Sequence, residues 1–249
     1  MTSDSAALTT DEIRRRVDDY EWYHAIDLGN GVITPGQYDL EPMLPHYGIA
    51  DSLDGKSVLD VGPAHGYFAF EFERRGATVA TAELPNWAEH DTGPALREEF
   101  ASFGDQSDYH RGAFGFAIQA RQSRIVRHFC NVYDLTPARV GTYDLVFCAS
   151  VLLHLTDPLR ALFAIRRVCR DQAIICTGID ITSGLEHEPR AMFIGSASGQ
   201  AFWLPTITCL ERMILAAGFA RIERVSTFHL KSNDGLFDTP HGTVRAFVG

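Results

Sequence analysis

The feature that most constrains this chain is a regular alternation of short β-rich runs with amphipathic segments, which begins at Ser57. Such alternation predicts a parallel sheet whose strands are joined by right-handed crossovers through helices. The expected strands span residues 57–61, 78–84, 124–132, 143–150 and 172–180, and the expected helices span residues 66–75 and 158–169.

The last part of the chain predicts a change of strand direction. An apolar stripe within residues 210–217 predicts a helix that ends at Gly218. Two β-rich runs follow, at residues 220–230 and 243–249, and only the turn-forming sequence SNDGLFDTPHG separates them. Because a parallel crossover needs about a dozen residues and usually a helix, we expect an antiparallel pair. The expected fold class is α/β: a seven-stranded, mostly parallel sheet with an antiparallel edge strand and helices on both faces.

The N-terminal region differs from the rest in composition. Thr9 and Glu12 form a capping-box pattern, which predicts a helix from Asp11 towards Tyr20. A loop rich in glycine and aromatic residues follows. Up to residue 50 the chain carries nine acidic residues and only three arginines. We expect an N-terminal helix and lid segment at residues 1–50 and a main domain at residues 51–249.

Composition narrows the possible partners. The chain has 249 residues, of which 45% are hydrophobic, so it can bury a large core and disorder is disfavoured. The net charge is −10, and Lys56 and Lys231 are the only lysines. A polyanion such as a nucleic acid would meet net repulsion unless the arginines cluster, so this charge disfavours a nucleic-acid partner.

The cysteines and the hydropathy pattern bear on the compartment. Five cysteines form no C-x-x-C pair and most lie in apolar runs, so we expect reduced, buried thiols and no metal. No window approaches the roughly 20 apolar residues needed to cross a bilayer, and the start MTSDSAALTTDE has no apolar signal core. We therefore expect a cytoplasmic protein without a membrane partner.

Polar and glycine residues gather where the first two strands end. The first strand ends in VLDVGPAHG, which places Asp60 at its carboxyl end and puts Gly62 and Gly66 around a tight turn. Open α/β sheets bind ligands in this crevice. Glu83 ends the next strand, where it can accept hydrogen bonds from both hydroxyls of a ribose. The pattern predicts a nucleoside cofactor.

A nicotinamide cofactor fits this pattern poorly. The turn is G-x-x-x-G and lacks the G-x-G-x-x-G of dinucleotide-binding proteins. Asp60 would repel a pyrophosphate at the helix N-terminus, whereas it suits an ammonium group. A nicotinamide-dependent oxidoreductase is therefore a weak alternative.

With these motifs the chain resembles the class I S-adenosylmethionine-dependent methyltransferases over about residues 50–249. The resemblance rests on the run Asp60-Val-Gly62-Pro-Ala-His-Gly66, on Glu83 and on ASVLLHLTDP. It implies a Rossmann-like fold, S-adenosyl-L-methionine as the methyl donor and S-adenosyl-L-homocysteine as the product. Ala64 stands where the family more often has its middle glycine.

Within that family the chain is similar to the tRNA wobble-uridine group, which includes 5-methoxyuridine and 5-carboxymethoxyuridine methyltransferases. Four motifs carry this similarity: Trp22-Tyr23-His24-x-Ile26-Asp27-Leu28-Gly29, Thr34-Pro35-Gly36, the run from Leu152 to Pro158, and Phe202-Trp203-x-Pro205-Thr206. Carboxymethyl-transferring members hold a carboxylated cofactor with lysines upstream of the first strand. Here only Lys56 stands there, so plain S-adenosylmethionine is favoured.

The resemblance also implies roles for particular residues. His154 and His24 are candidate general bases, with a structural hydrogen bond and packing as their respective alternatives. Asn131 would contact the adenine, or it caps a helix. The implied cofactor-binding residues are Tyr23, Asp60, Gly62, Pro63, Ala64, Gly66, Glu83, Leu84, Asn131, Val132 and Ser150, and the implied substrate-binding residues are Trp87, Tyr109, Phe193 and Trp203.

The leading hypothesis is a methyltransferase that acts on a hydroxyl or nitrogen of a small, sugar-like or natural-product molecule by in-line displacement. Arginines at 111, 121, 124 and 190 either grip an acidic group of the substrate or are solvated surface. A tRNA wobble-uridine methyltransferase and a non-catalytic nucleoside-binding scaffold are the alternatives. The sequence leaves the acceptor atom and the oligomeric state open.

Overall fold

The computed structural model describes residues 7–86, 89–92, 97–98, 108–195 and 201–249, and the side chains of residues 108–110 are outside this description. Within these ranges no helix combines the length and the apolar character that crossing a membrane requires. All five cysteines are free and four of them are buried, as expected for reduced core residues.

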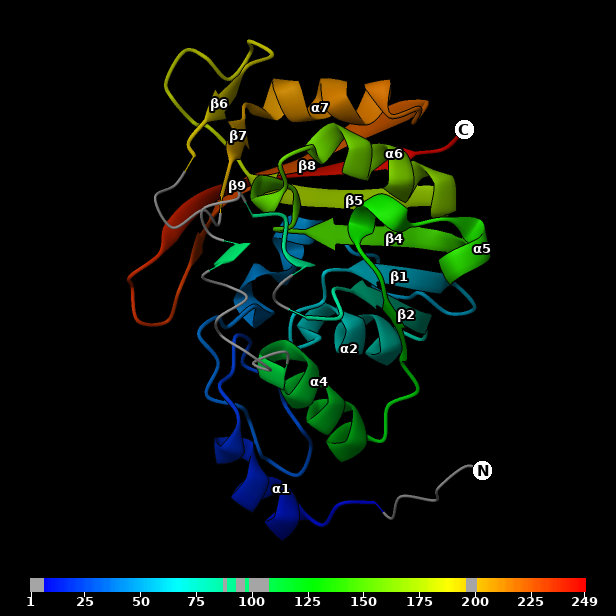
Figure 1. The fold of residues 1–249 in the computed structure, drawn as a ribbon, viewed down its shortest axis with the longest axis vertical. Coiled ribbons are helices and arrows are strands. Elements are labelled where there is room, and N and C mark those ends of the chain that lie inside the picture. Colours follow the sequence, from blue (N-terminus) through cyan, green and yellow to red (C-terminus); the bar gives the residue numbers. More distant parts are fainter. Residues whose placement is uncertain (1–6, 87–88, 93–96, 99–107, 196–200) are drawn as a thin grey trace.

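A seven-stranded sheet with the strand order β3-β2-β1-β4-β5-β9-β8 forms the centre of the molecule (Figure 1). The first five strands run parallel: β1 (Ser57–Val61), β2 (Thr78–Glu83), β3 (Val126–Phe129), β4 (Tyr143–Ala149) and β5 (Cys169–Gly178). β9 (Asp238–Phe247) is antiparallel both to β5 and to the edge strand β8 (Arg221–Lys231). The predicted fold class is confirmed, and the reversed strand lies one place in from the edge.

Helices cover both faces of the sheet, as predicted (Figure 1). One core holds side chains of α1 (Thr10–Arg16), α2 (Tyr67–Arg74) and α4 (Asp108–Arg121) together with Val58 and Phe147. The other holds side chains of α5 (Pro137–Val140), α6 (Pro158–Val168) and α7 (Ile207–Ala216) with Leu59 and Val146. Consecutive residues of one strand enter opposite cores because strand side chains alternate between the two faces.

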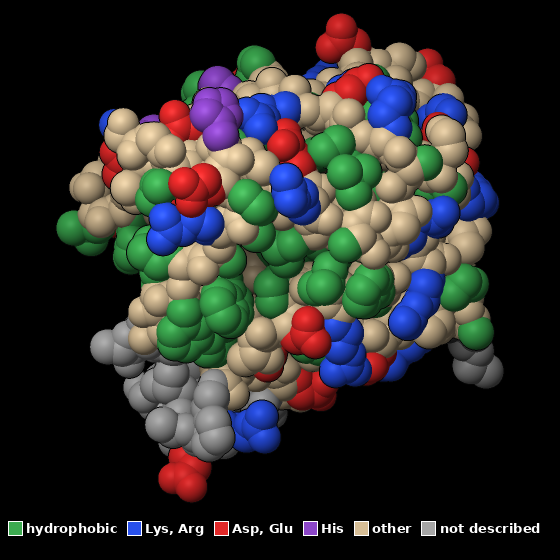
Figure 2. All heavy atoms as spheres, turned by 90° about the horizontal axis from the view of Figure 1, so that it is seen from above, with side chains coloured by type: hydrophobic (Ala, Val, Ile, Leu, Met, Phe, Trp, Pro, Cys, Tyr) green, Lys and Arg blue, Asp and Glu red, His purple; other side chains and the backbone are tan. Residues whose placement is uncertain are grey.

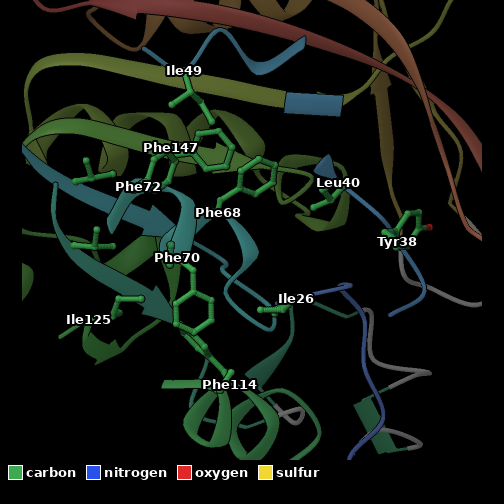
Figure 3. Close-up of a cluster of buried hydrophobic side chains, with 14 of the residues drawn as sticks. Ile26, Tyr38, Leu40, Ile49, Phe68, Phe70, Phe72, Phe114, Ile125 and Phe147 are labelled. Atoms are coloured by element: carbon green, nitrogen blue, oxygen red, sulfur yellow. The ribbon is translucent and has the colours of Figure 1, made fainter. Parts of the chain in front are cut away.

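The N-terminal region packs into the first of these cores. The capping box of Thr9 and Glu12 opens α1 as predicted, and the 3-10 helices Val17–Asp19 and Glu41–Tyr47 follow. Trp22, Ile26 and Leu40 are buried in the same cluster as the phenylalanines of α2. Figure 3 shows Leu40 near Phe68, whereas Tyr38 lies farther out in the same cluster. A domain boundary near residue 50 stays a prediction.

Three short elements complete the fold. Val132–Asp134 and Leu152–His154 form 3-10 helices directly after the third and fourth strands. A separate two-stranded sheet pairs β6 (Ala191–Phe193) with β7 (Trp203–Pro205), which the sequence did not predict.

Candidate functional site

A cavity of about 760 Å³ opens at the carboxyl ends of β1, β2 and β4. This is the crevice where open α/β sheets bind ligands. It brings together most of the residues proposed from the sequence. Those that line it are Tyr23, His24, Asp60, Gly62, Pro63, Ala64, Glu83, Leu84, Asn131, Val132, Ser150 and His154.

The glycine turn after β1 has a backbone that ordinary residues adopt only under strain. Gly62, Ala64 and Gly66 have φ angles of 73°, 48° and 88°. A Cβ at Gly66 would lie 2.1 Å from Cε2 of Phe114, so this glycine packs against α4 and does not line the cavity. Ala64 accepts a left-handed conformation that costs an L-residue about 1–2 kcal/mol. Ala64, which stands in place of the middle glycine, therefore keeps the left-handed turn of the cavity wall at the cost of backbone strain.

Asp60 places a buried carboxyl group at the cavity, and one of its oxygens lacks a hydrogen-bond partner among the described residues. Its side chain is 2% exposed, and its Oδ2 has no hydrogen-bond partner among the described residues. Burial, with the nearby charge of Glu83, raises the pKa of Asp60 to about 8. Burial disfavours the charged form of a carboxyl group, so a cation that enters the cavity would bring the missing partner. The site fits an ammonium group.

Glu83 is held by a bidentate ion pair that the sequence analysis missed. Arg127 on the neighbouring strand β3 donates from Nε to Oε1 at 2.8 Å and from Nη2 to Oε2 at 2.7 Å. Thr81 donates to Oε1 at 3.2 Å, and Arg127 itself lies between the rings of Phe114 and Phe129. These contacts fix the plane of the carboxylate and occupy both acceptor positions of Oε1, which leaves one position on Oε2 for a ligand hydroxyl.

Asn131 shows the capping arrangement that was weighed as its alternative. Its Oδ1 accepts a hydrogen bond from the backbone N–H of Tyr133 at 3.1 Å and so caps the 3-10 helix Val132–Asp134. The amide oxygen has two lone pairs, so this bond leaves one acceptor position open. An adenine contact by Asn131 stays a prediction.

The two N-terminal motifs pack against each other to form one wall of the cavity. The backbone N–H of Tyr23 donates to Nδ1 of His65, in the glycine turn, at 2.7 Å. Thr34 donates from Oγ1 to the carbonyl of His24 at 2.7 Å. A Cβ at Gly36 would lie 1.9 Å from the carbonyl carbon of His24. The Thr-Pro-Gly motif is therefore explained by the close approach of two backbone segments.

The two candidate bases differ in environment. His24 is 6% exposed, and its Nδ1 has no hydrogen-bond partner among the described residues. Burial, followed by the proximity of His65, lowers the pKa of His24 to about 3. His154 is an exposed residue at the cavity rim. Both line the cavity, and the role of each stays a prediction.

Two further histidines line the cavity that the sequence analysis did not use. His241 lies 3.0 Å from Ser150, between Nε2 and Oγ, and its Nδ1 lies 2.9 Å from the carbonyl oxygen of Thr239. Burial, followed by His154, lowers the pKa of His90 to about 4. His241 was placed in a turn, whereas it lies in β9 opposite Gly178. No sequence pattern marks His90.

Among the described aromatic residues expected at the acceptor, Phe193 and Trp203 do not line this cavity. Phe193 is 62% exposed and stacks edge-on against Trp203 at 5.0 Å. Trp203 lines a separate, mostly apolar cavity of about 290 Å³ beside α7. Trp87 and the side chain of Tyr109 lie outside the described residues. Phe193 and Trp203 thus pair across the small sheet of β6 and β7, and their role at the acceptor stays a prediction.

Only one of the four arginines considered for the substrate lines the cavity. Arg111 donates to the carbonyl of Pro85 at 2.9 Å and lies over the ring of Phe129. Arg121 lies over Phe70, and Arg190 forms an exposed ion pair with Glu188. Within the described part of the chain, no three His, Cys, Asp or Glu side chains are grouped to hold a metal ion.

The comparisons with known proteins agree with this geometry. The chain is similar to two proteins named tRNA U34 carboxymethyltransferase. The one from Dichelobacter nodosus is 29% identical over 178 residues, which cover 70% of this chain and 49% of the relative. The one from Helicobacter acinonychis is 24% identical, over 71% of this chain and 61% of the relative. The chain thus spans about half the length of the first of these relatives.

Solved structures share the fold at low identity. The N-terminal domain of EvdMO1, crystallised in the presence of SAH and D-fucose, has a TM-score of 0.68 and 17% identity, over 98% of both chains. The 1,6-didemethyltoxoflavin-N1-methyltransferase of Burkholderia thailandensis has a TM-score of 0.51 and 17% identity, over 83% of this chain and 77% of the other. A family model described as "Methyltransferase domain" matches residues 42–224, well over half of the chain. The chain therefore belongs to the methyltransferase-domain family.

Proposed function

We propose that this chain binds S-adenosylmethionine and transfers its methyl group to a hydroxyl or nitrogen of a small, sugar-like molecule. The observation that carries the cofactor half is the unpartnered Oδ2 of Asp60, which would accept the ammonium of the methionine part. The turn from Gly62 to Ala64 would lie along that part, and Oε2 of Glu83 would accept from a ribose hydroxyl. The cofactor supplies a methyl group activated by a sulfonium, so the protein mainly aligns the acceptor and excludes water.

The charge of the cavity supports an acceptor that is not an anion. Glu21 and Asp91 line it with acidic side chains and Glu83 is paired with Arg127, whereas Arg111 is the only Lys or Arg among the described residues of its lining. Since Arg111 already donates to a backbone carbonyl, a phosphate or carboxylate would enter against net negative charge. A neutral, hydroxyl-rich molecule avoids this repulsion.

The wall on the acceptor side suits a sugar-like shape. Tyr23, Tyr38 and Phe237 line the cavity with aromatic surface, and Gln37 and Thr239 add hydrogen-bonding groups. Flat apolar faces with a few polar groups are typical of small-molecule sites. The EvdMO1 domain was crystallised with D-fucose, which supports a deoxysugar as the first acceptor to test.

A tRNA wobble-uridine methyltransferase is the second candidate, because the curated relatives carry tRNA U34 carboxymethyltransferase as their name. Figure 2 shows one face of the molecule on which Lys and Arg side chains are interspersed with Asp and Glu. Lys56 precedes β1 at the opposite edge of the sheet, where it pairs with Asp171 at 3.7 Å and does not line the cavity. It is therefore poorly placed to hold a carboxylated cofactor.

Calorimetry on the whole chain separates the cofactor hypotheses. We expect micromolar binding of S-adenosylmethionine and S-adenosylhomocysteine and no binding of NAD. Binding of NAD would revive the oxidoreductase, and no binding of any of the three would contradict the proposed cofactor. Transfer of tritium from methyl-labelled S-adenosylmethionine is then measured to a glycoside panel, D-fucose and its p-nitrophenyl glycosides, and to wobble-uridine tRNA. If tritium appears in tRNA and not in the sugars, and if tRNA binding weakens as salt is added, the proposed acceptor is wrong.

A further inference from the structure

We propose that Ser150 and His241 form a proton relay that removes the proton of the methyl acceptor. In this relay the acceptor donates to the Ser150 hydroxyl, which passes its own proton to His241. The inference rests on the proposed function and deepens it, because it requires the acceptor to be a protic group, a hydroxyl or an N–H. Neither the sequence motifs nor the comparisons assign a role to His241.

The hydrogen bonds of His241 determine which ring nitrogen carries the proton. Its Nδ1 lies 2.9 Å from the carbonyl oxygen of Thr239. A carbonyl oxygen only accepts hydrogen bonds, so Nδ1 must be the protonated nitrogen of the neutral ring. The lone pair of Nε2 then points to the Ser150 hydroxyl, whose Oγ lies 3.0 Å away. The ring is therefore oriented to receive a proton from Ser150.

The backbone of Ser150 supports the same reading. Ser150 directly follows β4 and has a φ of 54°, one of four positive φ angles among the described non-glycine residues. Its N–H donates to the carbonyl of Cys176 on β5 at 2.9 Å, which holds the turn in place. Residues held in a disfavoured conformation cluster at functional sites. The turn sets the Ser150 hydroxyl at the carboxyl end of the sheet, on the cavity that also contains Gly62 and Asp60.

The other histidines of the cavity are less suited to this role. Burial makes His24 and His90 very weak bases, with pKa values near 3 and 4, and Nδ1 of His24 has no hydrogen-bond partner among the described residues. His154 is exposed, so water competes for its proton. Burial lowers the pKa of His241 too, since this residue is 3% exposed, but the Thr239 carbonyl opposes that shift because it accepts from Nδ1 and stabilises the imidazolium once it forms. The titratable groups that face His241 are His154 and His229, and His229 is paired with Asp238.

The step balances as a displacement with coupled proton transfer. The acceptor oxygen or nitrogen forms a bond to the methyl carbon while the carbon–sulfur bond breaks. The electron pair of the broken carbon–sulfur bond goes to sulfur. The acceptor proton moves to Oγ of Ser150, and the Ser150 proton moves to Nε2 of His241. The imidazolium then loses its Nε2 proton through Ser150 to water when the product leaves. No oxidant, metal or further reactant is required.

Two variants and a control test the relay on the whole chain. His241→Gln and Ser150→Ala should each lower kcat for the glycoside panel by about 100-fold to 10,000-fold, the usual contribution of a general base. The S-adenosylhomocysteine affinity of His241→Gln, measured by calorimetry, should stay within about twofold, since His241 contacts the relay only through Ser150. His128→Gln, on β3 outside the cavity, should leave both quantities unchanged. Unchanged kcat in either cavity variant, or a parallel loss of affinity and kcat in His241→Gln, would overturn the relay.

Nitrogen-15 NMR of the His241 ring gives a readout that needs no acceptor. At about pH 7 the relay requires Nδ1 to be protonated and Nε2 to be bare. A proton on Nε2 would make His241 a donor to Ser150 and would refute the proposal even in a folded, active enzyme. If wild-type protein binds S-adenosylhomocysteine but methylates no member of the panel, the proposed acceptor class is wrong, and the tautomer alone then decides for or against the relay.

Discussion

Binding of the cofactor should release a proton from Asp60. The pKa of this carboxyl group is raised to about 8, so at about pH 7 roughly 0.9 of the molecules carry a proton on Asp60 before binding. The ammonium of S-adenosylhomocysteine stabilises the carboxylate and lowers this pKa. We therefore expect release of roughly 0.9 proton per ligand at about pH 7 and roughly 0.5 at about pH 8, if the bound carboxyl group is fully ionised.

Calorimetry in buffers of different ionisation enthalpy measures this number, because the apparent binding enthalpy changes linearly with the heat of buffer protonation. The slope is the number of protons released. Asp60→Asn provides the matched control, since an amide releases no proton: its slope should be near zero and its affinity lower. A slope near zero in the wild type would refute the assignment of Asp60 to the ammonium group.

The same raised pKa has a consequence for stability without ligand. The folded state disfavours ionised Asp60, so this group lowers the free energy of unfolding as the pH rises from the unfolded pKa, 3.8, to about 8. Asp60→Asn should remove this dependence and raise Tm at neutral pH, by about 2–4 °C for each kcal/mol recovered. A lower Tm for Asp60→Asn would contradict the physical cause given for the shift.

Three further substitutions test the frame of the site. Ala64→Gly should leave Tm unchanged or raise it by a few degrees, because relief of about 1–2 kcal/mol of left-handed strain offsets the entropy that glycine loses on folding; a clear drop in a thermal melt would show that Ala64 is unstrained. Gly36→Ala should lower Tm by several degrees, since its Cβ would overlap the His24 backbone; an unchanged melt would mean that the wall yields freely. Arg127→Gln should lower the free energy of unfolding, measured with denaturant, by about 3–5 kcal/mol and weaken S-adenosylhomocysteine binding, because it leaves buried Glu83 without its ion-pair partner. The exposed control Arg139→Gln should lower it by less than about 1 kcal/mol, and equal losses would refute the role given to Arg127.

The sequence predicted the strands best where an apolar run is closed by a turn. The boundaries of β1 are those expected, because VLDV meets a glycine turn directly. β9 begins at Asp238, five residues before the predicted start, since Pro240 and Gly242 are typical of turns. Pro240 pairs with His229 of β8 and lies beyond the end of β5, so its missing N–H leaves no β5 carbonyl without a donor. The pairing of β9 with its neighbouring strands therefore outweighed the turn propensity of these two residues.

In the site, too, the sequence predicted residues that lie at strand ends but not the partners that come from distant parts of the chain. Asp60, Gly62 and Glu83 could be placed from sequence because the ends of parallel strands meet at one edge. The partners that orient these groups could not, since Arg127 is 44 residues from Glu83 and His241 is 91 residues from Ser150. Composition does not say which cavity an aromatic ring lines, so the acceptor role given to Phe193 and Trp203 stays a prediction, and Trp203 lines the smaller cavity.

Features that oppose folding gather at the same edge of the sheet as the proposed ligand contacts. Asp60 is buried without a partner for Oδ2, and Ala64 and Ser150 hold left-handed backbones. Each of these costs free energy in the protein alone, and none is required for the sheet, whose two cores lie on either side. A bound cation would offset the first of them, and a ligand that binds only the folded state at 100 times its Kd adds about 2.7 kcal/mol of stability. The strained edge is therefore better understood as a surface prepared for the cofactor and the acceptor than as imperfect packing.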